Sequence, residues 1–394
     1  MNKDLRAIIV TLACTALLTF SIGAQQPAAR PVAPELQLAR LSQISKDAQK
    51  SRQMATLSPV DFGWLLFVLE NWPSLAGQRG VPDGSKPFGA PGPVVWQTWK
   101  TAPEVYVAPN QTPLPWNLGL AGTPVLAQGE IDGRTLLDVN NNPVMYQVLM
   151  NQPTFNYLVS QKLYSFAGQE AARNNISSQI RFPSDALEVK ASWRILDPVA
   201  DQTRISHYLT QRVTYTGSDG SKLQLVVGLT GLHIASKVLP KWFWVTFEQT
   251  ENAATTKTKL NLPIPPDVAA GNAKMQRLLG GTFWQYYMMD GYQTEFLAAG
   301  KPTLLANSQI ETNFQSSSSC ITCHALASIG AANNPGGARF AFFKNFQGYI
   351  GAPPTSPFGP GPQQYTQLDY VWSMREAQRP AAKNPTTTSK EQVR

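Results

Sequence analysis

The chain has few of the residues that build disulfide frameworks and zinc centres. Its 394 residues include three cysteines and three histidines. Cys14 lies in an amino-terminal segment that we expect to be removed, which leaves Cys320 and Cys323. We therefore expect no disulfide framework. A zinc site is also disfavoured, because it needs further soft ligands and the chain offers only His207 and His233, far upstream.

Long apolar runs are scarce as well. Residues 7–22 are almost wholly apolar or small and follow a basic start, which predicts a signal peptide over residues 1–24, cleaved near Ala24. Lipidation at Cys14 and an uncleaved membrane anchor are the alternatives for this segment. Because no later run approaches the length of a membrane helix, we expect a periplasmic or secreted protein with no transmembrane span in the mature chain.

Charge is sparse and mainly positive. Charged residues make up 15% of the chain, the formal net charge is +8 and the pI is about 9.3. This excess favours an acidic redox partner or an anionic membrane surface, unless it only solvates the protein. We expect no nucleic-acid partner, because the basic residues are dispersed and the chain is predicted to be exported.

One motif carries the chemistry of this sequence, the pentapeptide Cys320-Ile321-Thr322-Cys323-His324. Cys-x-x-Cys-His is the spacing by which two thiols attach a haem and the following imidazole binds its iron. On a helix, positions i, i+3 and i+4 share one face, so all three side chains reach one porphyrin. The motif predicts one covalent haem c, with Cys320 and Cys323 as attachment points and His324 as proximal iron ligand.

The ends of this helix are also predicted from the sequence. The hydroxyls of Ser316 to Ser319 are suited to cap its start, and Gly330 is suited to end it. A redox dithiol and a plain disulfide are the competing interpretations of the two cysteines. No alternation of strands and helices surrounds the motif, which disfavours a thioredoxin-like dithiol.

The second axial ligand of the iron is left open by the sequence. Met374 follows His324 at a spacing comparable with small cytochromes c, and His233 ends an apolar strand. A methionine that fills a core gap and a structural histidine are the alternatives for these two residues. Weaker candidate ligands are Met288, Met289 and His207.

The axial ligand also separates the candidate functions. An iron with two protein ligands exchanges single electrons, whereas an open position binds small molecules. The first case predicts an electron carrier. The second predicts a haem peroxidase or oxidase, with His233 or Glu248 as acid or base, or a haem-based sensor.

The fold class expected from the sequence is α+β. Residues 187–247 are rich in β-branched and aromatic residues and predict antiparallel strands, including a hairpin at residues 212–229. We expect a disordered lead and helix over residues 25–55 and a β-rich domain over 56–266. A mainly helical, loop-rich, cytochrome c-like haem region over 267–377 and a disordered tail over 378–394 complete the prediction.

Several short segments carry a resemblance to a known group of proteins. They are Asn71-Trp72-Pro73, Arg79-Gly80-Val81-Pro82-Asp83, Val95-Trp96-Gln97-Thr98-Trp99-Lys100, Glu188-Val189-Lys190-Ala191-Ser192-Trp193, Gly231-Leu232-His233-Ile234 and Trp244-Val245-Thr246-Phe247-Glu248. With the late haem motif, the chain resembles bacterial exported proteins described as cytochrome c family proteins, in which a long tryptophan-rich region precedes one such motif. The resemblance implies haem binding and electron transfer, and names no substrate.

Overall fold

The fold is described from a computed structural model. The described residues are 37–119, 127–128, 130–131, 134–135, 144–175, 179–216, 222–252, 263–311, 315–335, 337–340, 350–359 and 364–377. The predicted signal peptide, the disordered lead and the carboxyl-terminal tail lie outside these residues.

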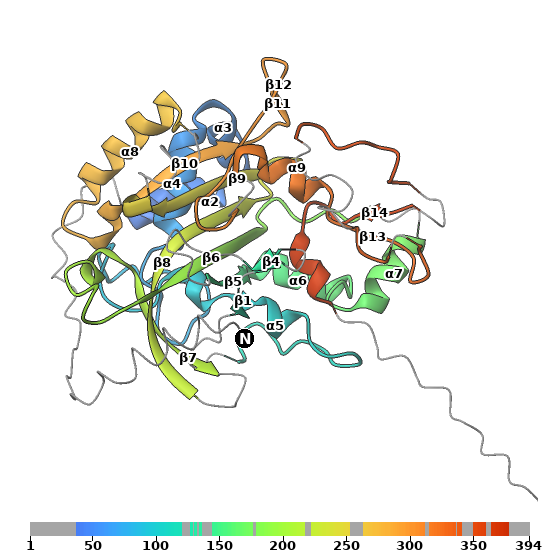
Figure 1. Cartoon of the computed structure of the whole chain (residues 1–394), viewed down its shortest axis with the longest axis horizontal. Coiled ribbons are helices and arrows are strands. Elements are labelled where there is room, and N and C mark those ends of the chain that lie inside the picture. Colours follow the sequence, from blue (N-terminus) through green and yellow to red (C-terminus); the bar gives the residue numbers. More distant parts are fainter. Residues whose placement is uncertain are drawn as a thin grey trace, which may run out of the picture.

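An antiparallel sheet of eight strands forms the centre of the molecule (Figure 1). Its main order is β1-β5-β6-β8-β9-β10, with β2 also paired to β5 and β7 also paired to β8. The strands are β1 (Lys100–Thr101), β2 (Ala127–Gln128), β5 (Met145–Met150), β6 (Leu187–Leu196), β7 (Thr210–Thr216), β8 (Lys222–Ser236), β9 (Phe243–Gln249) and β10 (Tyr287–Gln293).

The strands expected between residues 187 and 247 are confirmed. β7 and β8 pair as the predicted hairpin, with Thr216 opposite Lys222. Every residue of β9 is buried, as expected for a strand whose two faces both carry bulky side chains. β-branched and aromatic side chains fit this pleated, covered surface, which is why the sequence pattern was informative here.

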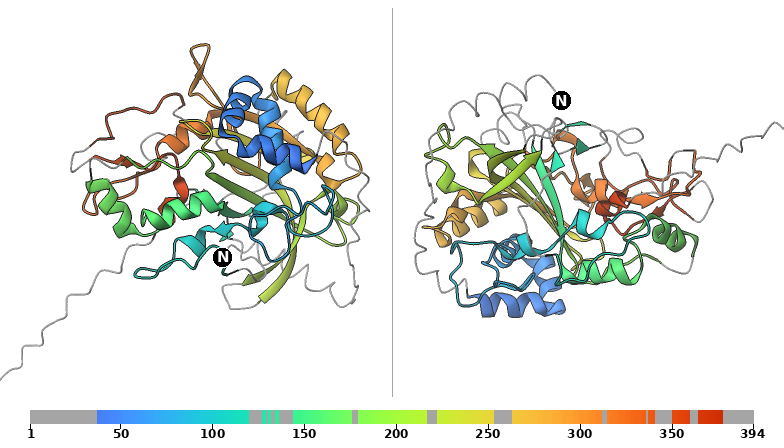
Figure 2. Two further views of the ribbon diagram at one scale, coloured as in Figure 1. Left: turned by 180° about the vertical axis from the view of Figure 1, so that it is seen from behind. Right: turned by 90° about the horizontal axis from the view of Figure 1, so that it is seen from below.

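Four helices lie on one side of the sheet, where two pack against β10 and the other two pack against one of these helices. They are α2 (Leu38–Lys46), α3 (Ala48–Leu57), α4 (Pro59–Glu70) and α8 (Pro266–Leu278), and they lie together on one side in Figure 2. α4 is buried from Phe62 to Glu70. Its Gly63 allows close approach, because a Cβ there would lie 2.6 Å from Met289 Cε and 3.0 Å from Val245 Cγ2. The apolar run of α4 is therefore a core helix.

The helix expected within residues 25–55 is interrupted. Asp47 ends α2 and begins α3, because its carboxylate accepts hydrogen bonds from the backbone N–H groups of Gln49 and Lys50. Such a cap satisfies donors that have no partner within the helix.

The remaining elements are short. The helices are α5 (Ala102–Val105), α6 (Gln152–Ser160), α7 (Phe166–Asn174) and α9 (Cys320–Ala325). The strand pairs are β3 (Glu130–Ile131) with β4 (Arg134–Thr135), β11 (Leu297–Ala298) with β12 (Lys301–Pro302), and β13 (Ser328–Ile329) with β14 (Thr366–Gln367). The 3₁₀ helices are η2 (Val95–Thr98), η3 (Ile205–His207), η4 (Thr250–Asn252), η6 (Phe283–Tyr286), η7 (Gln315–Ser317) and η8 (Trp372–Glu376).

The prediction of a mainly helical, cytochrome c-like carboxyl-terminal region is wrong, although the broad α+β class is compatible with the structure. Most helical residues precede this region. Among the described residues of 267–377, α8 is followed mainly by β10, short strand pairs, 3₁₀ turns and the six-residue α9. β10 pairs with β9 and so completes the main sheet, which satisfies the edge of β9. The haem motif is supported by this sheet and needs no helical module of its own.

The amino-terminal and carboxyl-terminal parts share one hydrophobic core. The main core cluster runs from Ala55 to Ala377 and includes residues on both sides of position 266, where α8 begins. Among the described residues, no helix combines the length and the apolar character needed to cross a bilayer.

Candidate functional site

The haem motif forms a helix, as predicted. α9 spans Cys320 to Ala325, which places the two thiols and the imidazole at helical positions i, i+3 and i+4. Cys320 is buried, and Cys323 and His324 are half-buried. The prediction that these three residues lie on one helix is therefore confirmed.

The start of α9 is held by the sheet and not by a serine hydroxyl. Gln293, the last residue of β10, accepts the Ile321 N–H at 3.1 Å and donates to Ser319 Oγ at 3.1 Å. Ser319 is the N-cap residue, but its side chain makes no capping bond to the helix backbone. The predicted serine cap is wrong in this detail, because Gln293 meets the helix from 27 residues upstream.

The end of α9 is held by the C-terminal segment, residues 364–377. Trp372 Nε1 donates to the Cys323 carbonyl at 2.8 Å, and Gln367 Nε2 donates to the Ala325 carbonyl at 2.9 Å. These side chains satisfy carbonyls that a short helix leaves without partners. The helix ends well before Gly330, so the predicted glycine stop is also wrong.

His324 is oriented by the same segment. Its Nδ1 lies 2.7 Å from the carbonyl oxygen of Tyr370. A carbonyl oxygen only accepts, so Nδ1 carries the proton and the lone pair of the imidazole resides on Nε2. The Trp244 ring packs against the imidazole, with ring centroids 4.3 Å apart. A histidine that donates its other nitrogen to a backbone carbonyl is the arrangement expected of an iron ligand.

The protonation state of His324 suits ligation. Burial and, to a smaller extent, the charges of His233 and Lys190 lower its pKa to about 4, although the hydrogen bond to Tyr370 and the charge of Glu311 oppose the shift. His324 is therefore neutral near pH 7. A neutral imidazole is the form that binds metals.

A cluster of ionisable groups lies on the polar face of the sheet beside the motif. Lys190 of β6 is directly opposite His233 of β8, and both act electrostatically on His324. Glu311, from the segment that precedes the motif, lies with its Oε1 3.5 Å from His233 Nε2. We call Lys190, His233 and Glu311 the charge cluster.

The charges in this cluster compensate one another. Burial alone would raise the pKa of Glu311, but the positive charges of His233 and Lys190 and the Asn307 N–H outweigh it and lower that pKa. Burial lowers the pKa of Lys190, and Glu311 opposes this shift. The pKa of the Cys320 thiol is raised well above its usual value by burial, with Glu311 adding to the effect.

A second polar network joins the sheet to the segment before the motif. Asn307 donates to Thr246 Oγ1 at 3.0 Å, and Ser308 Oγ donates to Glu248 at 2.5 Å. Burial raises the pKa of the neighbouring Asp290 carboxyl well above its usual value, and Glu248 adds to this effect. Glu248, one predicted acid or base, thus belongs to a buried hydrogen-bond network that holds the segment before the motif against the sheet.

The structure separates the two candidate distal ligands. His233 belongs to the charge cluster that acts on His324. Met374 lies in η8, has no exposed surface and belongs to the main core, where its backbone carbonyl accepts from Gln169 and Arg339. The structure therefore places His233, and not Met374, in the charge cluster.

The weaker candidates take other positions. Met288 and Met289 are buried in β10, and Met289 packs beside Gly63 on the far face of the sheet. His207 stacks on Tyr286 with ring centroids 3.8 Å apart. None of these observations associates the three residues with the motif helix.

The residues of α9 fit a covalently attached haem. The thiols have the required spacing, His324 is neutral, and its Nε2 has no hydrogen-bond partner among the described residues. In the described part of the chain, no group of three or more His, Cys, Asp or Glu side chains is placed to hold a bare metal ion. Two thiols and one neutral imidazole at this spacing are the groups by which a chain attaches a haem and binds its iron.

Several residues of the site were not identified from the sequence. Lys190 and Glu311 lie 121 positions apart, and only the folding of residues 303–311 across the sheet brings them together. The alternation of Glu188, Lys190 and Ser192 in β6 does indicate a polar sheet face. No pattern in the sequence shows what covers that face.

The chain matches no protein-family model, no curated protein and no solved structure. The case for its function therefore depends on the motif and the geometry around it.

Proposed function

We propose that the protein is a monohaem c-type cytochrome that transfers single electrons in the periplasm or outside the cell. The observation that carries this proposal is the α9 turn, where the Cys-x-x-Cys-His spacing is combined with a neutral His324 oriented by the Tyr370 carbonyl. Cys320 and Cys323 would hold the haem, and His324 would be its proximal ligand. The haem would supply a one-electron couple whose potential the surrounding protein adjusts.

The environment of α9 supports an electron carrier. The helix is fixed at its start by Gln293 and at its end by Gln367 and Trp372. A rigid attachment reduces the rearrangement that must accompany a change of charge. The half-buried Cys323 and His324 place this helix near the surface, where a partner protein can approach. The net positive charge of the chain favours an acidic partner.

Covalent attachment is tested with the exported protein. We expect the haem to stay with the polypeptide after denaturation and extraction with acidified solvent, and the mass to exceed that of the mature chain by one haem. Replacing both Cys320 and Cys323 by Ser should abolish attachment. Haem recovered in the organic phase from the unaltered protein would contradict the proposal.

A haem enzyme or sensor is the second candidate, and the charge cluster favours it. His233 and Glu311 lie within ion-pair distance of each other beside the motif, which is an arrangement that holds and moves a proton. Rapid binding of carbon monoxide and cyanide by high-spin iron would favour this candidate. Low-spin absorption bands in both oxidation states would favour the electron carrier.

A further inference from the structure

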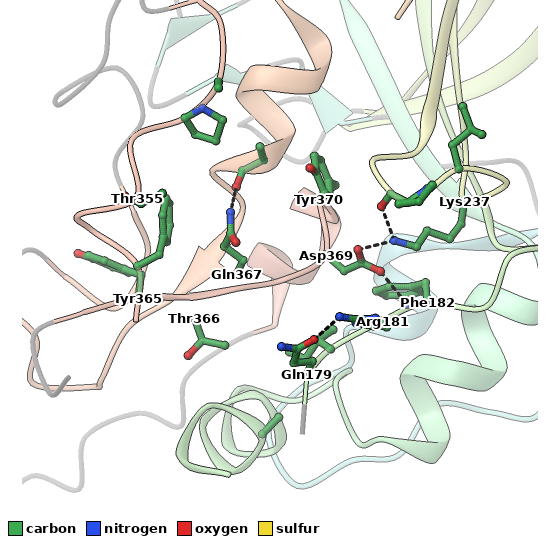
Figure 3. Close-up of a pocket in the computed structure, with 18 of the residues that line it drawn as sticks. Gln179, Arg181, Phe182, Lys237, Thr355, Tyr365, Thr366, Gln367, Asp369 and Tyr370 are labelled. Atoms are coloured by element: carbon green, nitrogen blue, oxygen red, sulfur yellow. Dashed lines mark hydrogen bonds and ion pairs between the residues drawn. The ribbon is translucent and has the colours of Figure 1, made fainter. Parts of the chain in front are cut away.

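A large cavity lies beside the motif helix, on a side that the haem proposal does not use (Figure 3). Its volume is about 1100 Å³, slightly above the roughly 300–1,000 Å³ typical of small-molecule sites. Ala325 of α9 lines it, whereas Cys320, Cys323 and His324 do not. None of the three residues proposed to hold the haem therefore lines the cavity.

An ion pair forms one polar wall of this cavity. Lys237 Nζ lies 2.5 Å from Asp369 Oδ1, and the two side chains are 10% and 8% exposed. The other carboxylate oxygen of Asp369 accepts the Phe182 N–H at 2.7 Å. Lys237 also donates to the Pro240 carbonyl. The carboxylate is thus compensated within the protein and adds little repulsion towards a bound anion.

The remaining charges of the lining are positive. Arg52, Arg173 and Arg181 also line the cavity, and Asp369 is the one carboxylate among its described lining residues. Arg181 is exposed and hydrogen-bonded to the Gln179 side chain (Figure 3). The lining therefore carries an excess of three formal positive charges, and a concave site of one sign concentrates ligands of the opposite sign.

The other walls are apolar and aromatic. Phe182 is buried and packs on the Tyr157 and Trp242 rings, with centroids 4.6 Å and 5.8 Å away. Tyr370 and Phe358 also line the cavity. Rings held in place in this way give a flat apolar ligand a preformed surface.

The backbone is strained next to the ion pair of Lys237 and Asp369. Asp369 and Tyr370 are consecutive non-glycine residues with φ values of 47° and 73°. Such conformations are uncommon and energetically unfavourable, persist only where the surrounding structure holds them, and concentrate at ligand and active sites. Here they direct the Asp369 carboxylate to Lys237 and the Tyr370 carbonyl to His324.

We propose that this cavity binds a small organic anion, a carboxylate with an aromatic body. The arginines at the rim would meet the carboxylate, and Phe182, Tyr370 and Phe358 would cover the ring. Guanidinium groups are well suited to carboxylates because they donate parallel hydrogen bonds. Because the Tyr370 carbonyl orients His324, the bound anion would lie directly behind the haem ligand.

Calorimetric titration of the full-length purified protein with 2-naphthoate tests this proposal. We expect saturable binding of one 2-naphthoate per chain. The uncharged analogue 2-naphthalenemethanol should bind at least about tenfold more weakly, because a hydrogen bond to a charged group contributes on the order of a factor of ten or more. Inorganic phosphate, which has the charge without the ring, should also bind more weakly.

Two variants locate the site. Arg181→Gln removes a rim cation and should weaken 2-naphthoate binding by about three- to tenfold. Thr355→Glu adds a negative charge at an exposed lining position and should weaken it as well. The matched control is Arg277→Gln, since Arg277 is exposed on α8 across the sheet, and this variant should bind as the unaltered protein does.

The proposal is overturned by any of three results: no saturable heat with 2-naphthoate, equal affinity for 2-naphthoate and its alcohol, or unchanged affinity in both rim variants. Binding of phosphate as tight as that of 2-naphthoate would contradict the role of the aromatic walls. The heat of binding does not depend on haem. Its outcome is therefore independent of whether the proposed cytochrome function is correct.

Discussion

Glu188 should make the stability of the protein depend on pH. This side chain of β6 is 8% exposed and accepts a hydrogen bond from Ser373 Oγ at 2.6 Å. Ser373 in turn lies 2.9 Å from the Tyr106 hydroxyl. The chain of bonds ties the sheet to the C-terminal segment that orients the motif helix.

The magnitude follows from the pKa of this carboxyl. Burial raises the pKa of Glu188 from 4.5 to about 7, although the bond from Ser373 opposes the shift. Below pH 4.5 the group is protonated in both the folded and the unfolded chain. Between pH 4.5 and 7 only the unfolded chain releases the proton, so stability falls as pH rises, by about 1.4 kcal/mol per pH unit. The accumulated loss is about 3 kcal/mol.

The perturbation is Glu188→Gln, which keeps an acceptor for Ser373 and cannot ionise. Relative to the unaltered protein, the unfolding free energy of this variant should rise by about 3 kcal/mol between pH 4.5 and 8. Urea titrations followed by tryptophan fluorescence at several pH values measure this difference. Comparing two proteins at each pH cancels the contributions of other titrating groups.

The control is Glu376→Gln, an exposed carboxylate in the same 3₁₀ helix as Ser373. It should leave the pH dependence as it is. If the difference between Glu188→Gln and the unaltered protein stayed constant from pH 5 to 8, the assignment of a buried, protonated Glu188 would be refuted.

Two further predictions concern the site. Gly231→Ala should lower the free energy of unfolding, measured by urea titration, by about 1–3 kcal/mol. The added Cβ would lie 2.8 Å from Asn307 Oδ1 and would displace the segment that leads to the motif. An unchanged urea midpoint would contradict this close packing. Substituting His233 and Met374 separately by Ala should convert only one variant to high-spin iron, and we expect it to be His233→Ala because His233 lies in the charge cluster. Low-spin spectra from both variants would exclude both ligands.

The strands that could be predicted were those whose own residues, or the turn beside them, have a pattern typical of a strand. In β9 both the odd-numbered and the even-numbered positions include bulky side chains, which indicates a strand covered on both faces. β7 and β8 flank a run of glycine, serine and aspartate, which is typical of a turn. β10 lacked such a signal. Its segment reads as extended or mixed, and its membership of the sheet depends on the unpaired edge of β9, which lies in another part of the sequence.

The candidate site likewise has a part that the sequence predicted and a part that it did not. The sequence by itself determined that two thiols and an imidazole share one face of a helix, because the helical period alone brings these positions together. The tertiary structure alone decided what surrounds them. The Tyr370 carbonyl orients His324 from 46 residues away, and Glu311 meets His233 from another part of the chain. Such contacts depend on which polar groups remain without a hydrogen-bond partner once the sheet has formed. The sequence near each residue does not indicate which groups these are.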